Sequence, residues 1–117
     1  MADVLIYHNP RCSKSREALA LLQQRGVQPR VITYMQDGLT RRELQDLLAK
    51  LQIGARELLR KAETAYRERA LASNGLSDTQ LIDAMVAEPC LMQRPIVVCG
   101  ELAVVARPAQ RALDVVR

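Results

Sequence analysis

The first third of the chain sets its fold class, because two strand-like segments flank one helical segment. Residues 4–7 (VLIY) form a short apolar run, and Asn9-Pro10 is typical of a turn. Apolar residues then recur at helical spacing over residues 12–25, and Gly26 signals the end of the helix. Residues 31–34 (VITY) are a second β-branched run. The pattern predicts a βαβ unit with parallel strands, and therefore an α/β fold.

The middle of the chain is predicted to be helical throughout. Thr40 and Glu43 have the spacing of a capping box, which opens a helix to about residue 51. Residues 55–71 are helix-prone without a clear single period. A second capping-box pair, Ser77 and Gln80, opens a helix to about residue 86.

Strand character returns after Pro95. Residues 96–99 and 102–106 flank a Gly-Glu turn, as expected of a hairpin, and a short helix is predicted near Pro108. The order is βαβ, a helical insertion and then ββα, which predicts a mixed four-stranded sheet. A chain of 117 residues suffices for one hydrophobic core, so we predict a single domain over residues 1–117.

Composition argues against a nucleic-acid or membrane partner. The chain has no Phe, no Trp and three Tyr, too few aromatic residues for a base-stacking surface. Its formal charge of +4 comes from lysines and arginines that are interleaved with acids rather than clustered. Residues 1–6 resemble neither a signal peptide nor a membrane span, so we expect a cytoplasmic protein.

The cysteines match neither a zinc site nor a disulfide framework. There are three of them, Cys12, Cys90 and Cys99, and a single histidine, so no metal site is expected. Cys90 and Cys99 are interpreted as small buried apolar residues. Cys12 differs, because it lies where the first strand and its turn give way to a helix.

A thiol in the first turn of a helix meets unpaired backbone N–H groups and the positive end of the helix dipole, which favour the thiolate. The same N–H groups can bind an oxyanion. His8 can support the thiolate or merely close the strand, and Ser13 and Ser15 can supply hydroxyl donors to an oxyanion or merely cap the helix. Arg94 and Arg107 each precede a proline beside a predicted strand, where they can clamp an oxyanion or lie exposed on the surface.

The residue three positions after Cys12 is Ser15, where a dithiol redox motif has its second cysteine. Cys12 therefore has no local partner for a disulfide. A redox cycle at this thiol requires an external thiol, or a distant cysteine such as Cys90 or Cys99.

Five segments together resemble the glutaredoxin-coupled, ArsC-like arsenate reductases of the thioredoxin-like superfamily. They are IYHNPRCSKSR from Ile6, ARELLRK from Ala55, LIDAMVAEP from Leu81, LMQRPIVV from Leu91 and ARP from Ala106. The likeness covers nearly the whole chain. It implies a thioredoxin-like sheet with a helical insertion and a cis peptide bond before Pro95.

The resemblance also implies a reaction: reduction of arsenate to arsenite through a covalent adduct between the Cys12 thiolate and arsenate. Glutathione would be the co-substrate and glutaredoxin the protein partner, with no bound cofactor, and we expect a monomer. By resemblance Cys12 is the nucleophile. The residues implied to assist its thiolate are His8 and Ser15, and those implied to bind the oxyanion are Arg60, Arg94 and Arg107.

The likeness is greater to the short members of this family than to the longer ones. The longer members have a C-terminal extension, and Gly-Thr in place of Ser13-Lys14. Two alternatives stay open. One is a redox-sensitive regulatory module of the same fold that binds RNA polymerase, although such regulators sense oxidation through a Cys-x-x-Cys pair. The other is a thiol reductase of another small electrophile, which would use the same residues.

Overall fold

The computed structural model describes residues 3–116, which form two compact units. Of these residues, the sheet unit contains 3–37 and 94–116, and the helical unit is Gly38–Gln93. The helical unit coincides with the helical insertion that the sequence predicts. A single domain over residues 1–117 stays a prediction.

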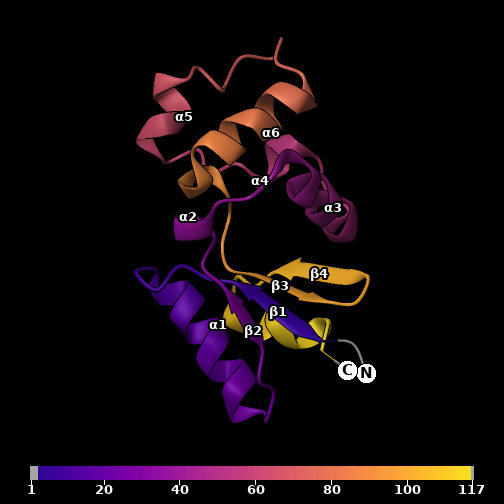
Figure 1. Cartoon of the computed structure of the whole chain (residues 1–117). Helices are drawn as coiled ribbons and strands as arrows, with labels where there is room; N and C mark the ends of the chain where they lie inside the picture. The colour runs from indigo at the N-terminus through magenta and orange to yellow at the C-terminus, as the bar shows by residue number, and fades with distance from the viewer. Residues whose placement is uncertain (1–2, 117) are drawn as a thin grey trace. The chain divides into compact units, whose positions relative to one another are not determined.

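The sheet unit contains all the named strands of the described residues (Figure 1). Its elements are β1 (Val4–Tyr7), α1 (Ser13–Gln24), β2 (Arg30–Ile32), α2 (Tyr34–Asp37), β3 (Ile96–Cys99), β4 (Leu102–Val105) and the 3₁₀ helix η2 (Ala109–Asp114). The strand order is β2-β1-β3-β4, with β1 parallel to β2 and antiparallel to β3, and β3 antiparallel to β4. The prediction of a mixed four-stranded α/β sheet is confirmed.

Aliphatic side chains from the sheet, α1 and η2 form the core of the sheet unit. Ile6 lies at its centre, because it pairs with Val31 on one side and with Val97 on the other. Ile6, Leu22 and Val97 have no exposed surface. The other buried members of this cluster are Ala18, Val104, Ala106, Ala109, Ala112 and Val115. This core fixes the position of α1, and with it the residues at the N-terminus of that helix.

Truncating Leu22 to alanine is expected to lower the free energy of unfolding by about 3 kcal/mol, because it removes apolar contacts and leaves a cavity under α1. Equilibrium denaturation with urea measures the loss. Leu102→Ala is the matched control, since Leu102 is 42% exposed on β4 and its truncation should cost far less. Equal losses from the two substitutions would contradict the assignment of this core.

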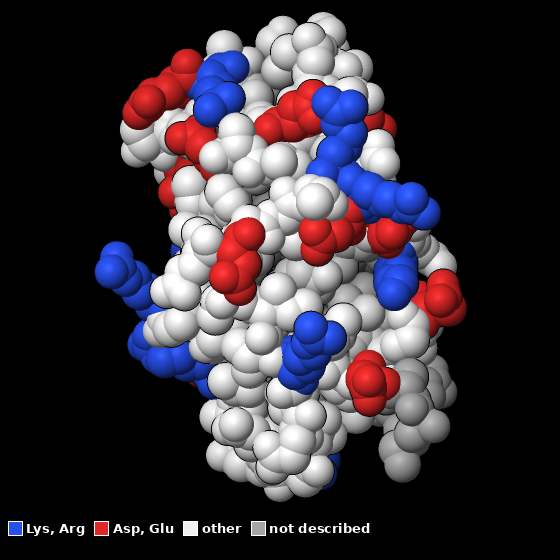
Figure 2. All heavy atoms as spheres, viewed as in Figure 1, with Lys and Arg blue, Asp and Glu red and all other residues white. Residues whose placement is uncertain are grey.

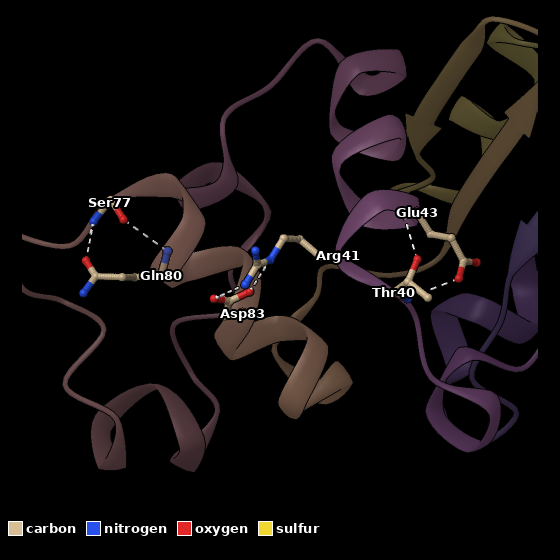
Figure 3. Close-up of polar contacts among 6 residues, drawn as sticks. All are labelled: Thr40, Arg41, Glu43, Ser77, Gln80 and Asp83. Atoms are coloured by element: carbon tan, nitrogen blue, oxygen red, sulfur yellow. Dashed lines mark hydrogen bonds and ion pairs between the residues drawn. The ribbon is translucent and has the colours of Figure 1, made fainter.

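The helical unit consists of α3 (Arg41–Leu51), α4 (Ala55–Leu58), α5 (Thr64–Glu68), α6 (Asp78–Ala87) and the 3₁₀ helix η1 (Pro89–Leu91). Both predicted capping boxes are present, at Thr40–Glu43 and at Ser77–Gln80 (Figure 3). Helices α3 and α6 pack together. Arg41 on α3 also makes two hydrogen bonds of 2.8 and 2.9 Å to the carboxylate of Asp83 on α6.

Two secondary-structure predictions are wrong. Strand β2 ends at Ile32, and Tyr34 begins α2 because the N–H groups of Gln36 and Asp37 donate to the carbonyl of Thr33. The segment 55–71 is not continuously helical: α4 ends at Leu58, and Leu59 forms an isolated antiparallel bridge with Met92. This long-range pairing replaces the local hydrogen bonds that would have continued the helix.

Candidate functional site

Cys12 occupies the N-cap position of α1, at the end of the loop that follows β1. Its backbone is extended, with φ −96° and ψ 121°, and its carbonyl accepts the N–H of Arg16 at 3.1 Å. The side chain is partly buried. The turn residues 9–10 end the strand and the core contacts of α1 hold the helix, so the thiol is placed where the sequence predicts it.

The surroundings of Cys12 favour its thiolate. Partial burial by itself raises the pKa of the thiol, but several groups outweigh it and bring the pKa below its ordinary value of 9.0. These groups are the backbone N–H of Ser15, a hydrogen bond from the Arg94 side chain, the backbone N–H of Lys14 and the positive charge of Arg94. The helix terminus and one arginine from a distant part of the chain therefore act on the same sulfur.

His8 and Ser15 form a buried hydrogen-bonded pair beside this helix terminus. The distance from His8 Nδ1 to Ser15 Oγ is 2.7 Å, and Ser15 has no exposed surface. The N–H of Asn9 donates to the same Oγ at 3.0 Å. Because Oγ accepts that hydrogen bond, its own proton is available for Nδ1 of a neutral imidazole. Ser15 thus joins α1 to the loop after β1 instead of capping the helix.

The imidazole of His8 is expected to be neutral at pH 7, because burial, and then the charge of Arg16, lower its pKa below 6.5. His8 is the only histidine of the chain, so a proton NMR titration reads it directly. Arg16→Ala should raise this pKa, whereas Arg25→Ala, at the other end of α1, should leave it unchanged. A wild-type value at or above 6.5 would contradict the predicted effect of burial.

Asn9 shapes the loop, a role that was not predicted from the sequence. Its Oδ1 accepts the N–H of Arg11 at 3.0 Å, and its backbone carbonyl accepts the N–H of Cys12 at 2.9 Å. Arg16 closes the loop from α1 by donating to the carbonyl of Pro10 at 2.7 Å. The Asn-Pro dipeptide predicted a turn. Asparagine side chains often accept a backbone N–H two residues on in such turns, so the same dipeptide could also have predicted the hydrogen bond from Arg11 to Asn9.

The three arginines implied by the resemblance have different surroundings. Arg94, just before β3, hydrogen-bonds to Cys12 and so belongs to the site. Arg107 follows β4 and is exposed, and within residues 3–116 its guanidinium makes no hydrogen bond or ion pair. The peptide bonds from both arginines to the following prolines are cis.

Arg60 belongs to the helical unit and does not lie on a helix, contrary to the sequence-based prediction. It follows the bridge at Leu59, and its N–H donates to the carbonyl of Leu91 at 2.7 Å. Its Nε lies 3.2 Å from Glu63 Oε1, within ion-pair range, although the direction of the N–H bond does not suit a hydrogen bond. Arg60 is therefore held by an acid of its own unit, and its role in oxyanion binding stays a prediction.

The other two cysteines are more accessible than the sequence predicts. Cys90 and Cys99 are half-buried rather than fully buried, and no disulfide links the cysteines in the described part of the chain. Residues 3–116 contain no cluster of three or more His, Cys, Asp or Glu side chains that could hold a metal ion. Figure 2 shows basic and acidic side chains interspersed over the face drawn. No helix among the same residues is long and apolar enough to cross a membrane.

Residues 7–115 match the ArsC family, and the chain belongs to that family. The match includes the Cys12 loop, the helical unit and both Arg-Pro pairs. The solved structure of an arsenate reductase from Vibrio cholerae superposes with a TM-score of 0.96 at 42% identity, covering 98% of each chain. The fold is therefore the thioredoxin-like fold of the arsenate reductase structures.

Individual relatives extend over nearly all of the chain. The "Uncharacterized protein YfgD" of Escherichia coli K12 is 49% identical, over 97% of both chains. An arsenate reductase of Haemophilus influenzae is 40% identical and is covered over 98% of its length. An arsenate reductase of Escherichia coli is 41% identical, but the match covers 82% of its length. Relatives of similar length and longer relatives thus both align with nearly the whole of this chain.

Proposed function

We propose that this protein reduces arsenate to arsenite, with Cys12 as the nucleophile and glutathione and glutaredoxin as the reductants. The observation that carries the proposal is the position of Cys12, where helix N–H groups and Arg94 favour a thiolate. The names of the relatives support arsenate as the substrate. Arsenate is a tetrahedral oxyanion, which suits the same donors.

In the first step the Cys12 sulfur forms a bond to arsenic, and one arsenate oxygen is protonated and leaves as water. The adduct then reacts with the glutathione thiolate. Arsenic gains two electrons and leaves as arsenite, while the two sulfurs are oxidised to a mixed disulfide between Cys12 and glutathione. Glutaredoxin attacks this disulfide, takes the glutathione and restores the Cys12 thiolate.

Within this scheme each site residue has one role. Arg94 stabilises the Cys12 thiolate and the negative charge of the bound oxyanion. The pair His8–Ser15 fixes the loop and the first turn of α1 around the thiol. Arg107 and Arg60 are proposed to contribute further positive charge to the oxyanion.

The test is a coupled assay in which glutathione reductase and NADPH regenerate glutathione, with glutaredoxin present. Arsenate should drive NADPH oxidation that depends on glutaredoxin, and phosphate should not, because phosphorus is not reduced under these conditions. Absence of arsenate turnover by a preparation whose Cys12 still reacts with a thiol reagent would reject arsenate as the substrate. That outcome would favour a different electrophile or the regulatory function.

A further inference from the structure

A cavity of about 290 Å³ lies beside the loop that carries the nucleophile. One wall is formed by His8, Asn9, Pro10 and Arg11, the four residues that directly precede Cys12. The other wall is formed by Thr33, Met35 and Gln36, which follow β2. The cavity therefore lies between the loops that leave the carboxyl ends of the two parallel strands, a common place for ligands in α/β sheets.

The cavity is larger than the oxyanion requires. A water molecule takes up about 30 Å³ in the liquid, so an anion with four oxygens would fill less than half of the space. Its volume is close to the lower limit of pockets that bind small organic ligands, about 300 Å³. The wall also has an apolar part, since Pro10 and Met35 are both exposed.

The polar groups of the wall favour a ligand with carboxylate groups. Arg11 supplies a guanidinium, and no Asp or Glu lines the cavity. Asn9 Oδ1 already accepts the N–H of Arg11, so the Asn9 amide meets a ligand as an NH₂ donor. The hydroxyl of Thr33 donates to Asp37 Oδ2 at 2.9 Å and so meets a ligand as an acceptor, for example of a peptide N–H. The cavity thus combines donors for a carboxylate with an acceptor for an amide.

We propose that this cavity binds the peptide part of glutathione and presents its thiol to Cys12. The inference rests on the proposed function, which needs a second sulfur next to Cys12. Glutathione has two carboxylates and two amide groups, in agreement with the wall. Its apolar methylene groups can lie against Pro10 and Met35.

The direct test uses S-methylglutathione, which lacks a free thiol and binds without reacting. It is titrated into the isotope-labelled full-length protein, and backbone amide NMR signals are followed. Signals of Arg11, Thr33 and Gln36 should move together with one dissociation constant. Absence of binding, or shifts confined to other parts of the surface, would overturn the proposal. Shifts at these residues caused by phosphate but not by S-methylglutathione would also overturn it, because they would identify an oxyanion site.

Two arginine variants, Arg11→Ala and Arg25→Ala, test whether the charge of Arg11 contributes to binding. Arg11→Ala should weaken S-methylglutathione binding about tenfold, the effect of one charge-assisted hydrogen bond. Arg25→Ala removes another exposed arginine, just beyond the end of α1, and should change binding less than twofold. Equal effects of the two substitutions would contradict a specific role for Arg11.

A diester of S-methylglutathione, which has no free carboxylate, tests whether Arg11 recognises the ligand's carboxylates. The diester should bind more weakly than the free acid to the wild-type protein, and Arg11→Ala should cause no further loss. A tenfold loss with the diester would overturn the carboxylate assignment.

Binding of S-methylglutathione by a protein without arsenate turnover would support the cavity and reject only the arsenate substrate. Turnover without binding in the cavity would reject the cavity alone.

Discussion

Cys12→Ser is expected to lower the rate of arsenate reduction by about a thousandfold or more, as is usual when a nucleophile is removed. A serine hydroxyl is not ionised near neutral pH, so the attack on arsenic loses its nucleophile. It also cannot form the mixed disulfide with glutathione, so the electrons have no route to arsenic. The coupled NADPH assay measures the loss.

The matched controls are Cys90→Ser and Cys99→Ser, which remove the other thiols of the chain. Both should retain activity within about threefold, because the proposed cycle takes its second sulfur from glutathione. A thousandfold loss in either control would instead indicate an internal disulfide with Cys12. Full activity of Cys12→Ser would reject the whole mechanism, including the role of the helix terminus.

The helices that could be predicted from the sequence are those whose capping residues, stop residues and apolar periodicity lie within or next to the helix itself. Helix α1 has an apolar face and a Gly26 stop, and α3 and α6 each have a capping box, so local contacts specify them. The strands β3 and β4 were predicted for the same reason, because a turn separates two β-branched runs. Tyr34 was placed wrongly: the run VITY has high β propensity throughout, and nothing local shows where the edge strand stops pairing.

The site residues that lie close together in the sequence could be predicted to be neighbours, and those that lie far apart could not. His8, Cys12 and Ser15 lie within one loop and helix turn, so their proximity could be derived from the sequence. The hydrogen bond from Arg94 to Cys12 depends on how β3 pairs with β1, which no local pattern reveals. The extended backbone at Arg60 likewise depends on the pairing of Leu59 with Met92. The Arg-Pro pattern left Arg94 as either an oxyanion ligand or a surface residue, and only the resemblance to a known family indicated Arg60.

Arg94→Ala is expected to lower the rate of arsenate reduction about 100-fold, which is typical when one charge-stabilising donor is removed from an active site. The substitution removes both the hydrogen bond to Cys12 and the charge that lower its pKa. The thiolate pKa should therefore rise. Since the rate requires the thiolate, the acid limb of the pH–rate profile should move to higher pH, and raising the pH should restore part of the activity.

Arg94→Lys and Arg107→Ala separate the two effects of Arg94. The lysine keeps the charge without the planar fork, so the pKa of Cys12 should rise less than in Arg94→Ala. Arg107 is not among the groups that lower the pKa of Cys12, so Arg107→Ala should raise the KM for arsenate and leave the acid limb in place. Titration of the thiolate absorbance, with Cys90 and Cys99 replaced by serine, measures the pKa directly. An unchanged pKa in Arg94→Ala would show that the helix N–H groups alone stabilise the thiolate, and would limit Arg94 to binding the oxyanion.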